Sequence, residues 1–127
     1  MRQLEQAKLL VKKAAEDEDL LAETLSSTRV SDEIFGFHCQ QAAEKLLKAL
    51  LSQASIGYSR THNLRLLMDL LADSGQPIPS DLDDLDMLTP YGTLFRYEDL
   101  PVDVELDRET FFLRIKSLRE FVEKRLS

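Results

Sequence analysis

The sequence contains a single cysteine, Cys39, among its 127 residues, so no disulfide can form within the chain. No apolar run approaches the roughly 20 residues that a membrane-spanning helix needs. The first residues are already polar and helical in pattern, unlike a signal peptide. We therefore expect a protein of the reducing cytoplasm with no membrane partner. Cys39 itself is predicted to be a small buried hydrophobic residue rather than a nucleophile.

The sequence also lacks the motifs of common cofactor and metal sites. It contains no P-loop, no dinucleotide-binding glycine fingerprint, no zinc-ligand spacing and no serine-nucleophile motif. Aspartates lie close together at positions 81, 83, 84 and 86, but their spacing matches no EF-hand. Aspartate at the start of a helix is favourable without any ion. We expect neither a metal nor a cofactor.

Basic charge is scarce and unevenly placed. The chain carries a formal net charge of -7, and residues 81–109 hold ten acidic residues against two arginines, so the remainder sums to +1. A globally basic surface for non-specific nucleic-acid binding is therefore not supported. The acidic segment would either repel nucleic acid or meet a basic protein partner. Hydrophobic residues at 43% and charged residues at 31% are ordinary for a globular protein, and the length predicts one domain over residues 1–127.

Apolar residues recur with helical spacing along most of the chain, and no strand pattern is convincing. The expected architecture is an all-α, up-and-down helical bundle of four to five helices. We predict helices over about residues 2–25, 31–54, 61–74, 81–95 and 108–125, the fourth of them bent or broken at Pro90.

Several residues are predicted to mark helix ends. Ser31 and Thr61 are expected N-caps, and Ser80 with Asp83 resembles a capping box. Gly57 is the expected stop of the second helix.

Two acids, Glu18 and Asp19, fall on or near the packing face of the first helix. An acid on such a face needs a partner or costs several kcal/mol. They lie either at a solvent-facing end of the bundle or pair with Arg96 or with a lysine of the second helix.

The second helix is the most informative segment. The side chains in the middle of its apolar face are small, so the backbone of another helix can approach closely. The face consists of Phe35, Cys39, Ala42, Leu46, Ala49 and Leu50. A polar stripe with the spacing i, i+3, i+7 and i+10 runs beside it, made of His38, Gln41, Lys45 and Lys48. An imidazole, an amide and two ammonium groups in a row can grip a phosphate or the carboxylate of a partner, and the helix alone does not decide between them.

Four short sequence motifs resemble those of one known family in their order and spacing. Residues 37–45 read FHCQQAAEK, which is similar to the second-helix signature FHAQQAAEK of the HEPN domain family. The words THNL at 61–64, RYED at 96–99 and EDL at 18–20 resemble its THDL, RYPD and EDL elements. Asn63 and Glu98 depart from that pattern. The resemblance covers nearly the whole chain.

The resemblance implies a helical bundle like the substrate-binding subunit of a nucleotidyltransferase, commonly a homodimer. Many members of the family work with a small nucleotidyltransferase in toxin–antitoxin or defence systems, and some are metal-independent ribonucleases. The ribonuclease signature is an arginine followed four to six residues later by a histidine. His38 lies nine residues after Arg29, His62 lies two after Arg60, and no histidine follows Arg96. This absence favours a binding or partner module over an enzyme.

On this reading the chain binds a nucleotide, RNA or a nucleotidyltransferase partner. His38 and Lys45 would contact a phosphate that Arg96 clamps, and Tyr97 would stack on a base. The full predicted binding set is His38, Gln41, Lys45, His62, Arg96 and Tyr97, supported by Asp19, Glu44 and Asp99.

Two alternatives remain open. One is a ribonuclease with a rearranged site, in which Arg96 polarises the phosphate and His38 or His62 acts as acid or base. The other is a pure scaffold, in which the polar groups are internal hydrogen bonds. In that case Arg96 forms a buried ion pair with Asp19 or Glu18, and Glu44 pairs with Lys48 on the surface.

Overall fold

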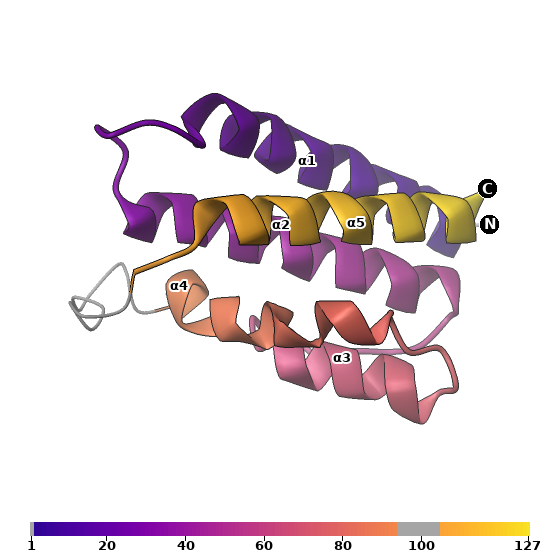
Figure 1. The fold of residues 1–127 in the computed structure, drawn as a ribbon. Helices are drawn as coiled ribbons and strands as arrows, with labels where there is room; N and C mark the ends of the chain where they lie inside the picture. Colours follow the sequence, from indigo (N-terminus) through magenta and orange to yellow (C-terminus); the bar gives the residue numbers. More distant parts are fainter. Residues whose placement is uncertain (1, 94–104) are drawn as a thin grey trace.

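The computed structural model describes residues 2–93 and 105–127, and the described residues form helices without a strand (Figure 1). The expected all-α bundle is therefore confirmed. The elements are α1 (Arg2–Thr24), α2 (Asp32–Gln53), α3 (Leu64–Asp73), a 3₁₀ helix η1 (Ser80–Leu88), α4 (Thr89–Thr93) and α5 (Arg108–Leu126). No helix in the described ranges is both long and apolar enough to span a bilayer.

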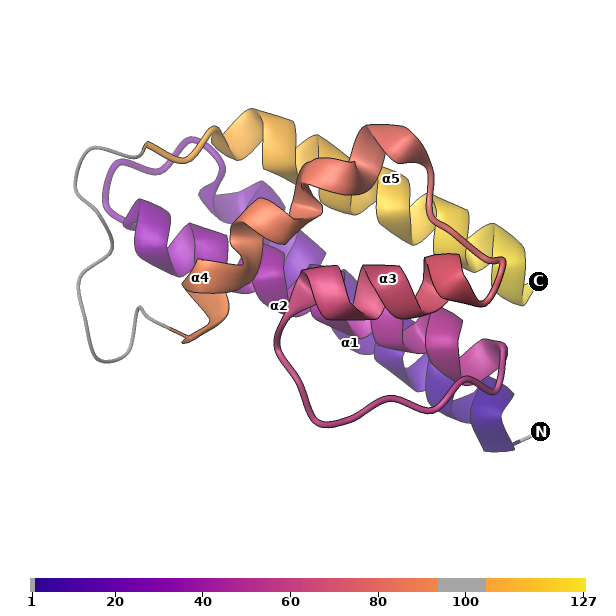
Figure 2. The ribbon, with the colours of Figure 1, turned by 90° about the horizontal axis from the view of Figure 1, so that it is seen from below.

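The second helix is the centre of the bundle. α1 runs antiparallel to α2, and α5 packs against both on one side, while α3, η1 and α4 lie on the opposite side of α2 (Figures 1 and 2). Because every other element contacts it, α2 is buried on most of its circumference. Phe35, Cys39 and Leu46 are 1% exposed or less.

α2 and α4 approach each other closely at Gly36 and Gln40, which lie on a different side of α2 from the small-residue face predicted from the sequence. A Cβ on Gly36 would lie 2.3 Å from the ring of Tyr91. A Cβ on Gly92 would lie 2.4 Å from Cδ of Gln40. Glycine at each position thus leaves room for a side chain of the other helix to lie against its backbone.

The second helix begins and ends as a consequence of its flanking residues. The Ser31 side chain accepts a hydrogen bond from the Ile34 amide at 3.2 Å, so the predicted N-cap is confirmed. The expected stop at Gly57 is wrong. Ser55 takes the left-handed conformation instead, with φ of 58°, directly after the C-cap residue Ala54.

The start of the third helix also differs from the prediction. Asn63, not Thr61, is the N-cap, and its side chain accepts a hydrogen bond from the Leu66 amide at 3.1 Å. The Thr89 hydroxyl accepts from the Leu64 amide at 3.2 Å, so a residue 25 positions away helps to fix the first turn.

The predicted fourth helix is a 3₁₀ helix followed by one short α-helix. The capping box at Ser80 is wrong, because Pro79 is the N-cap residue and makes no side-chain cap bond. The carboxylates of Asp83 and Asp86 bind Arg65 of α3 instead. The change of helix type falls one residue before Pro90, where the missing N–H prevents continuation of the ladder. Residues 94 and 95 of the prediction lie outside the described residues.

Ion pairs fix α5 to its neighbours. Arg119 binds both carboxylate oxygens of Glu18, at 2.6 and 3.2 Å, and this arginine of α5 is not among the partners expected from the sequence. Asp19 is exposed. Arg114 binds both oxygens of Asp84. Together with the Arg65 pairs, three of the four clustered aspartates are matched by arginines of the chain.

Candidate functional site on the second helix

Polar side chains cover a continuous arc of α2 between α1 and the connection from α2 to α3. At 100° per residue, neighbouring polar positions lie 20–40° apart around the helix. Asp17 of α1 and His62 of the α2–α3 connection complete the set. We call the eight residues the α2 polar face: Asp17, His38, Gln40, Gln41, Glu44, Lys45, Lys48 and His62.

Asp17 joins one half of the face to α1. One carboxylate oxygen lies 3.1 Å from Nδ1 of His38, and the other accepts from Nζ of Lys45 at 2.6 Å. The Asp17 side chain is 12% exposed, and the other two are 27% and 28% exposed. The predicted neighbours His38 and Lys45 therefore do lie together, but an acid from the same chain lies between them.

Glu44 organises the other half. Its carboxylate accepts from Nε2 of Gln40 at 2.9 Å and from Nζ of Lys48 at 2.8 Å, and Nδ1 of His62 lies 2.8 Å away. Gln40 also donates to the backbone carbonyl of His62 and accepts from Nε2 of Gln41. One buried carboxylate and one buried amide thus hold the α2–α3 connection against α2.

The surface location expected for the Glu44–Lys48 pair is wrong, although the pair itself is present. Glu44 is 7% exposed, because Gln40 and His62 cover it. Burial alone would raise the pKa of this carboxyl, but the hydrogen bonds from Lys48, Gln40 and His62 outweigh burial and lower the pKa below its usual value. Glu44 is therefore ionised at neutral pH.

The two carboxylates decide which imidazole edge is available to a ligand. A carboxylate can only accept, so each contact requires a proton on Nδ1 of the histidine. The opposite ring edge, with Nε2, then points away from the carboxylate. The His62 side chain is 60% exposed, and that of His38 is partly exposed at the other end of the face. Around the circumference of α2, Gln41 and Lys45 lie between Glu44, which holds His62, and His38.

The structure brings together His38, Gln41, Lys45, Glu44 and His62 from the predicted set. It does not bring Asp19 to them, because the acid that reaches the face is Asp17. Arg96, Tyr97 and Asp99 lie outside the described residues.

Sequence reasoning missed Asp17 and Gln40. Gln40 belongs to the FHCQQAAEK motif, and that motif could have indicated it. Asp17 becomes recognisable only when the packing of α1 on α2 is known.

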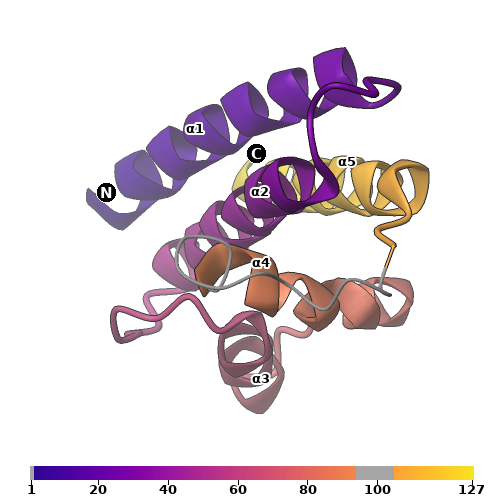
Figure 3. The ribbon, with the colours of Figure 1, turned by 90° about the vertical axis from the view of Figure 1, so that its left-hand side faces the viewer.

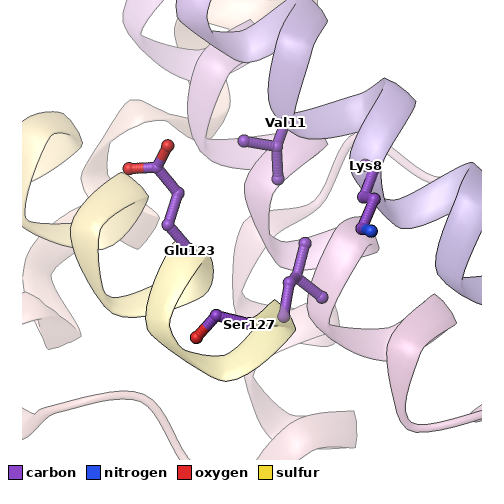
Figure 4. Close-up of a pocket in the computed structure, with 5 residues that line it drawn as sticks. Lys8, Val11, Glu123 and Ser127 are labelled. Carbon is purple, nitrogen blue, oxygen red and sulfur yellow. The ribbon is translucent and has the colours of Figure 1, made fainter.

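Two other features of the fold do not resemble a site for chemistry. Cys39 is 0% exposed, and burial raises its pKa to about 12, so it is a neutral thiol as expected. A cavity of about 310 Å³ lies where the ends of α1 and α5 meet (Figure 4), and its lining is mostly apolar surface with Lys8 and Glu123 at its edge.

Replacing Glu44 with glutamine is expected to lower the free energy of unfolding at pH 7 by about 2 kcal/mol, because hydrogen bonds to a charged, buried group are lost. The lowered pKa means that ionised Glu44 stabilises the fold above the carboxyl's ordinary value of 4.5, and that this contribution disappears as the pH falls through the folded pKa. Urea unfolding from pH 7 down to about pH 3 measures the difference between the two proteins.

The difference should shrink toward zero in acid, where protonated glutamate resembles glutamine. Glu120→Gln, at an exposed position of α5, is the matched control and should differ little from the wild type at any pH. A Glu44→Gln deficit that stays constant with pH would contradict this assignment.

A family model described as the HEPN domain matches residues 7–125, almost the whole chain and all of the α2 polar face. No curated protein and no solved structure matches the chain.

Proposed function

Because the chain belongs to the HEPN domain family, we propose that it is a binding module whose α2 polar face takes the ribose–phosphate part of a nucleotide or RNA. The observation that carries the proposal is that His38 and His62 are each held by a carboxylate of the chain, Asp17 and Glu44 respectively. Each ring contacts a carboxylate through Nδ1, which leaves Nε2 on the ring edge away from that carboxylate.

The groups on the face suit a sugar–phosphate backbone. A neutral imidazole accepts at Nε2 from a ribose hydroxyl, and a protonated one donates there to a phosphate oxygen. Lys45 has three donors, of which Asp17 takes one, and Gln41 retains an amide donor and its carbonyl oxygen. Because of the RYED motif, we include Arg96 as a residue that binds the phosphate, Tyr97 as a ring on which a base stacks, and Asp99 as their support.

The charges of the face predict how binding responds to salt. Lys45 and Lys48 balance Asp17 and Glu44, so the face has no net charge with neutral histidines. We therefore expect hydrogen bonding to dominate. The logarithm of RNA affinity should fall against the logarithm of salt concentration with a slope of only about -1, as for one or two phosphate contacts.

The same family membership supports a nucleotidyltransferase as the protein partner, in a toxin–antitoxin or defence setting. The partner is proposed to be positioned so that the α2 polar face remains open to the nucleotide.

Asparagine substitutions separate ligand binding from scaffolding. The asparagine amide nitrogen falls near the place of Nδ1, so His38→Asn and His62→Asn retain the donor to Asp17 or Glu44 while removing Nε2. We expect each to weaken binding of a fluorescein-labelled short RNA about tenfold, one hydrogen bond's worth, with little change in melting temperature. Fluorescence anisotropy measures the affinity.

The glutamine variants and a remote lysine serve as controls. His62→Gln places its amide near Nε2 but loses the Nδ1 donor, so it should lower the melting temperature more than His62→Asn. Lys116→Ala, on the exposed side of α5, should leave RNA affinity unchanged. Asparagine variants that bind RNA as tightly as the wild type would overturn the site and leave the scaffold reading.

One observation favours ribonuclease activity as a second candidate. The Glu44–His62 pair has the form of a general base, an imidazole oriented by a carboxylate with its second nitrogen exposed. This candidate requires RNA cleavage that persists in EDTA and disappears in His62→Asn. Intact RNA after prolonged incubation with the wild-type protein would exclude it and leave the binding proposal standing.

A further inference from the structure

A polar pocket lies where the C-terminal end of α2 meets the first turns of α1. Its volume is about 340 Å³, and its lining consists of Gln3, Gln6, Ser52 and residues 55–58. Ligand sites in proteins commonly occupy about 300–1,000 Å³, so the pocket is large enough for a small ligand. In Figure 3, α1 lies above α2 and the connection from α2 to α3 lies below it. We call this site the α1–α2 pocket.

The α1–α2 pocket continues the α2 polar face along the helix. Ser52 follows Lys45 and Lys48 with the spacing i, i+3 and i+7, so the three residues lie on one side of α2. Ser52 is seven positions after Lys45, which corresponds to about 10 Å along the helix axis. A nucleotide has about this length from its phosphate to the far edge of its base. A ligand whose phosphate lies at Lys45 can therefore place its base in the pocket.

The groups that line the pocket are neutral. Gln3 and Gln6 contribute exposed carboxamides, neither of which has a hydrogen-bond partner among the described residues. The hydroxyls of Ser52 and Tyr58 lie 3.4 Å apart, and Tyr58 also contributes the surface of its ring. No charged side chain lines the pocket in the part of the chain that the structure describes. Such a lining suits an uncharged ligand with hydrogen-bonding edges better than a phosphate.

Ser55, on the wall of the pocket, is held in a conformation that serine rarely takes. Its φ is 58°, in the left-handed region where glycine is the usual residue after a helix. A residue with a Cβ is strained there, so glycine would suit the backbone better. Backbone strain of this kind gathers at functional sites, and here it accompanies a polar side chain at the pocket.

We propose that the α1–α2 pocket takes the base of the nucleotide, and that this base is adenine; the inference rests on the proposed function for the ribose–phosphate part. A carboxamide donates and accepts at once, which matches the adjacent N6 donor and N7 acceptor of adenine. Guanine is read by arginine or lysine and cytosine by a carboxylate, and neither kind of group lines the pocket. The Tyr58 ring supplies a surface against which an unstacked base packs.

Nitrogen NMR titration of the full chain with adenosine monophosphate (AMP) tests the proposal, with ribose 5-phosphate as the ligand that lacks a base. We expect AMP to bind at least tenfold more tightly than ribose 5-phosphate and than the guanine, cytosine and uracil mononucleotides, because only adenine gains the paired hydrogen bonds. The side-chain amide signals of Gln3 and Gln6 should move with AMP and stay in place with ribose 5-phosphate.

Alanine variants locate the base. Gln3→Ala and Gln6→Ala should each weaken AMP binding about tenfold and leave the affinity for ribose 5-phosphate unchanged. Both positions are exposed and alanine favours a helix, so the fold should persist. Leu9→Ala, at an exposed position of α1 outside the pocket, is the matched control and should bind AMP like the wild type.

The pocket and the α2 polar face fail in different ways. If only the α2 polar face is wrong, His38→Asn and His62→Asn leave AMP affinity unchanged, while the effects of Gln3→Ala and Gln6→Ala persist. If only the pocket is wrong, AMP and ribose 5-phosphate bind equally well and the glutamine variants have no effect. Tighter binding of another mononucleotide than of AMP, or glutamine amide signals that do not move at excess AMP, also overturns the inference.

Discussion

Replacing Arg108 with alanine is expected to lower the free energy of unfolding by about 3–5 kcal/mol, because the carboxylate of Asp32 and three backbone carbonyls lose their partner together. Nε of Arg108 binds Asp32 at 2.7 Å, and Nη1 donates to the carbonyls of Thr24 and Ser27 at 2.9 and 3.1 Å. Nη2 donates to the carbonyl of Val30. One guanidinium thereby closes the connection between α1 and α2 against the start of α5.

The geometry of the guanidinium explains why lysine should not replace it. The side chain of Arg108 is 15% exposed, and its guanidinium carbon lies 5.0 Å from the centre of the Phe35 ring. An ammonium group lacks the planar fork that reaches four acceptors at once, so Arg108→Lys should lose about half as much stability as the alanine variant.

Urea unfolding monitored by circular dichroism measures these losses. Arg29→Ala is the matched control, because Arg29 is an exposed arginine in the same connection, and it should change stability by less than about 0.5 kcal/mol. Should Arg108→Ala fail to fold, the lysine variant still reports on the fork. Equal effects of substitution at Arg29 and Arg108 would contradict this role.

The second large effect is expected at Gly92, where alanine should cost about 2–3 kcal/mol through overpacking and a displaced hydrogen-bond network. The added Cβ would lie 2.4 Å from Cδ and 2.5 Å from Oε1 of Gln40. Gln40 is 0% exposed and holds Glu44 and the carbonyl of His62, so it cannot move aside without breaking those bonds. Gly92→Ala should therefore also weaken ligand binding at the α2 polar face.

Thermal unfolding measures the melting temperatures of Gly92→Ala, at a crowded site, and of Gly57→Ala, at an open site, for comparison with the wild type. A Cβ on Gly57 meets nothing within 4 Å, so alanine there should be neutral or slightly stabilising. Combining Gly92→Ala with Gln40→Ala should cost less than the sum of the two single changes, since the shorter side chain makes room. Additive costs would show that the two residues do not press against each other.

Local patterns in the sequence were sufficient to predict the helices. The spacing of apolar residues predicted α1, α2 and α5 to within one residue at nearly every end, and Ser31 was recognisable as a cap because its partner is three residues away. The FHCQQAAEK word identified the family that the match over residues 7–125 supports.

Features that depend on distant residues could not be predicted. The choice of Asn63 over Thr61 as cap involves Thr89, and the replacement of an α-helix by η1 involves Arg65 of α3. Glu44 and Lys48 were visible as an i, i+4 pair, but the burial of Glu44 requires His62, 18 residues away. Packing, rather than propensity, sets these outcomes.

The most direct test of the binding role is nitrogen NMR of the imidazole rings near neutral pH, with and without RNA. The chain has only two histidines, so one His62→Asn variant assigns both rings. We expect the proton on Nδ1 of His38 and of His62 in the free protein, and a shift of both Nε2 signals when RNA is added. A proton on Nε2 alone in the free protein, or Nε2 signals that do not move at excess RNA, would contradict the proposal that the α2 polar face binds the ribose–phosphate backbone.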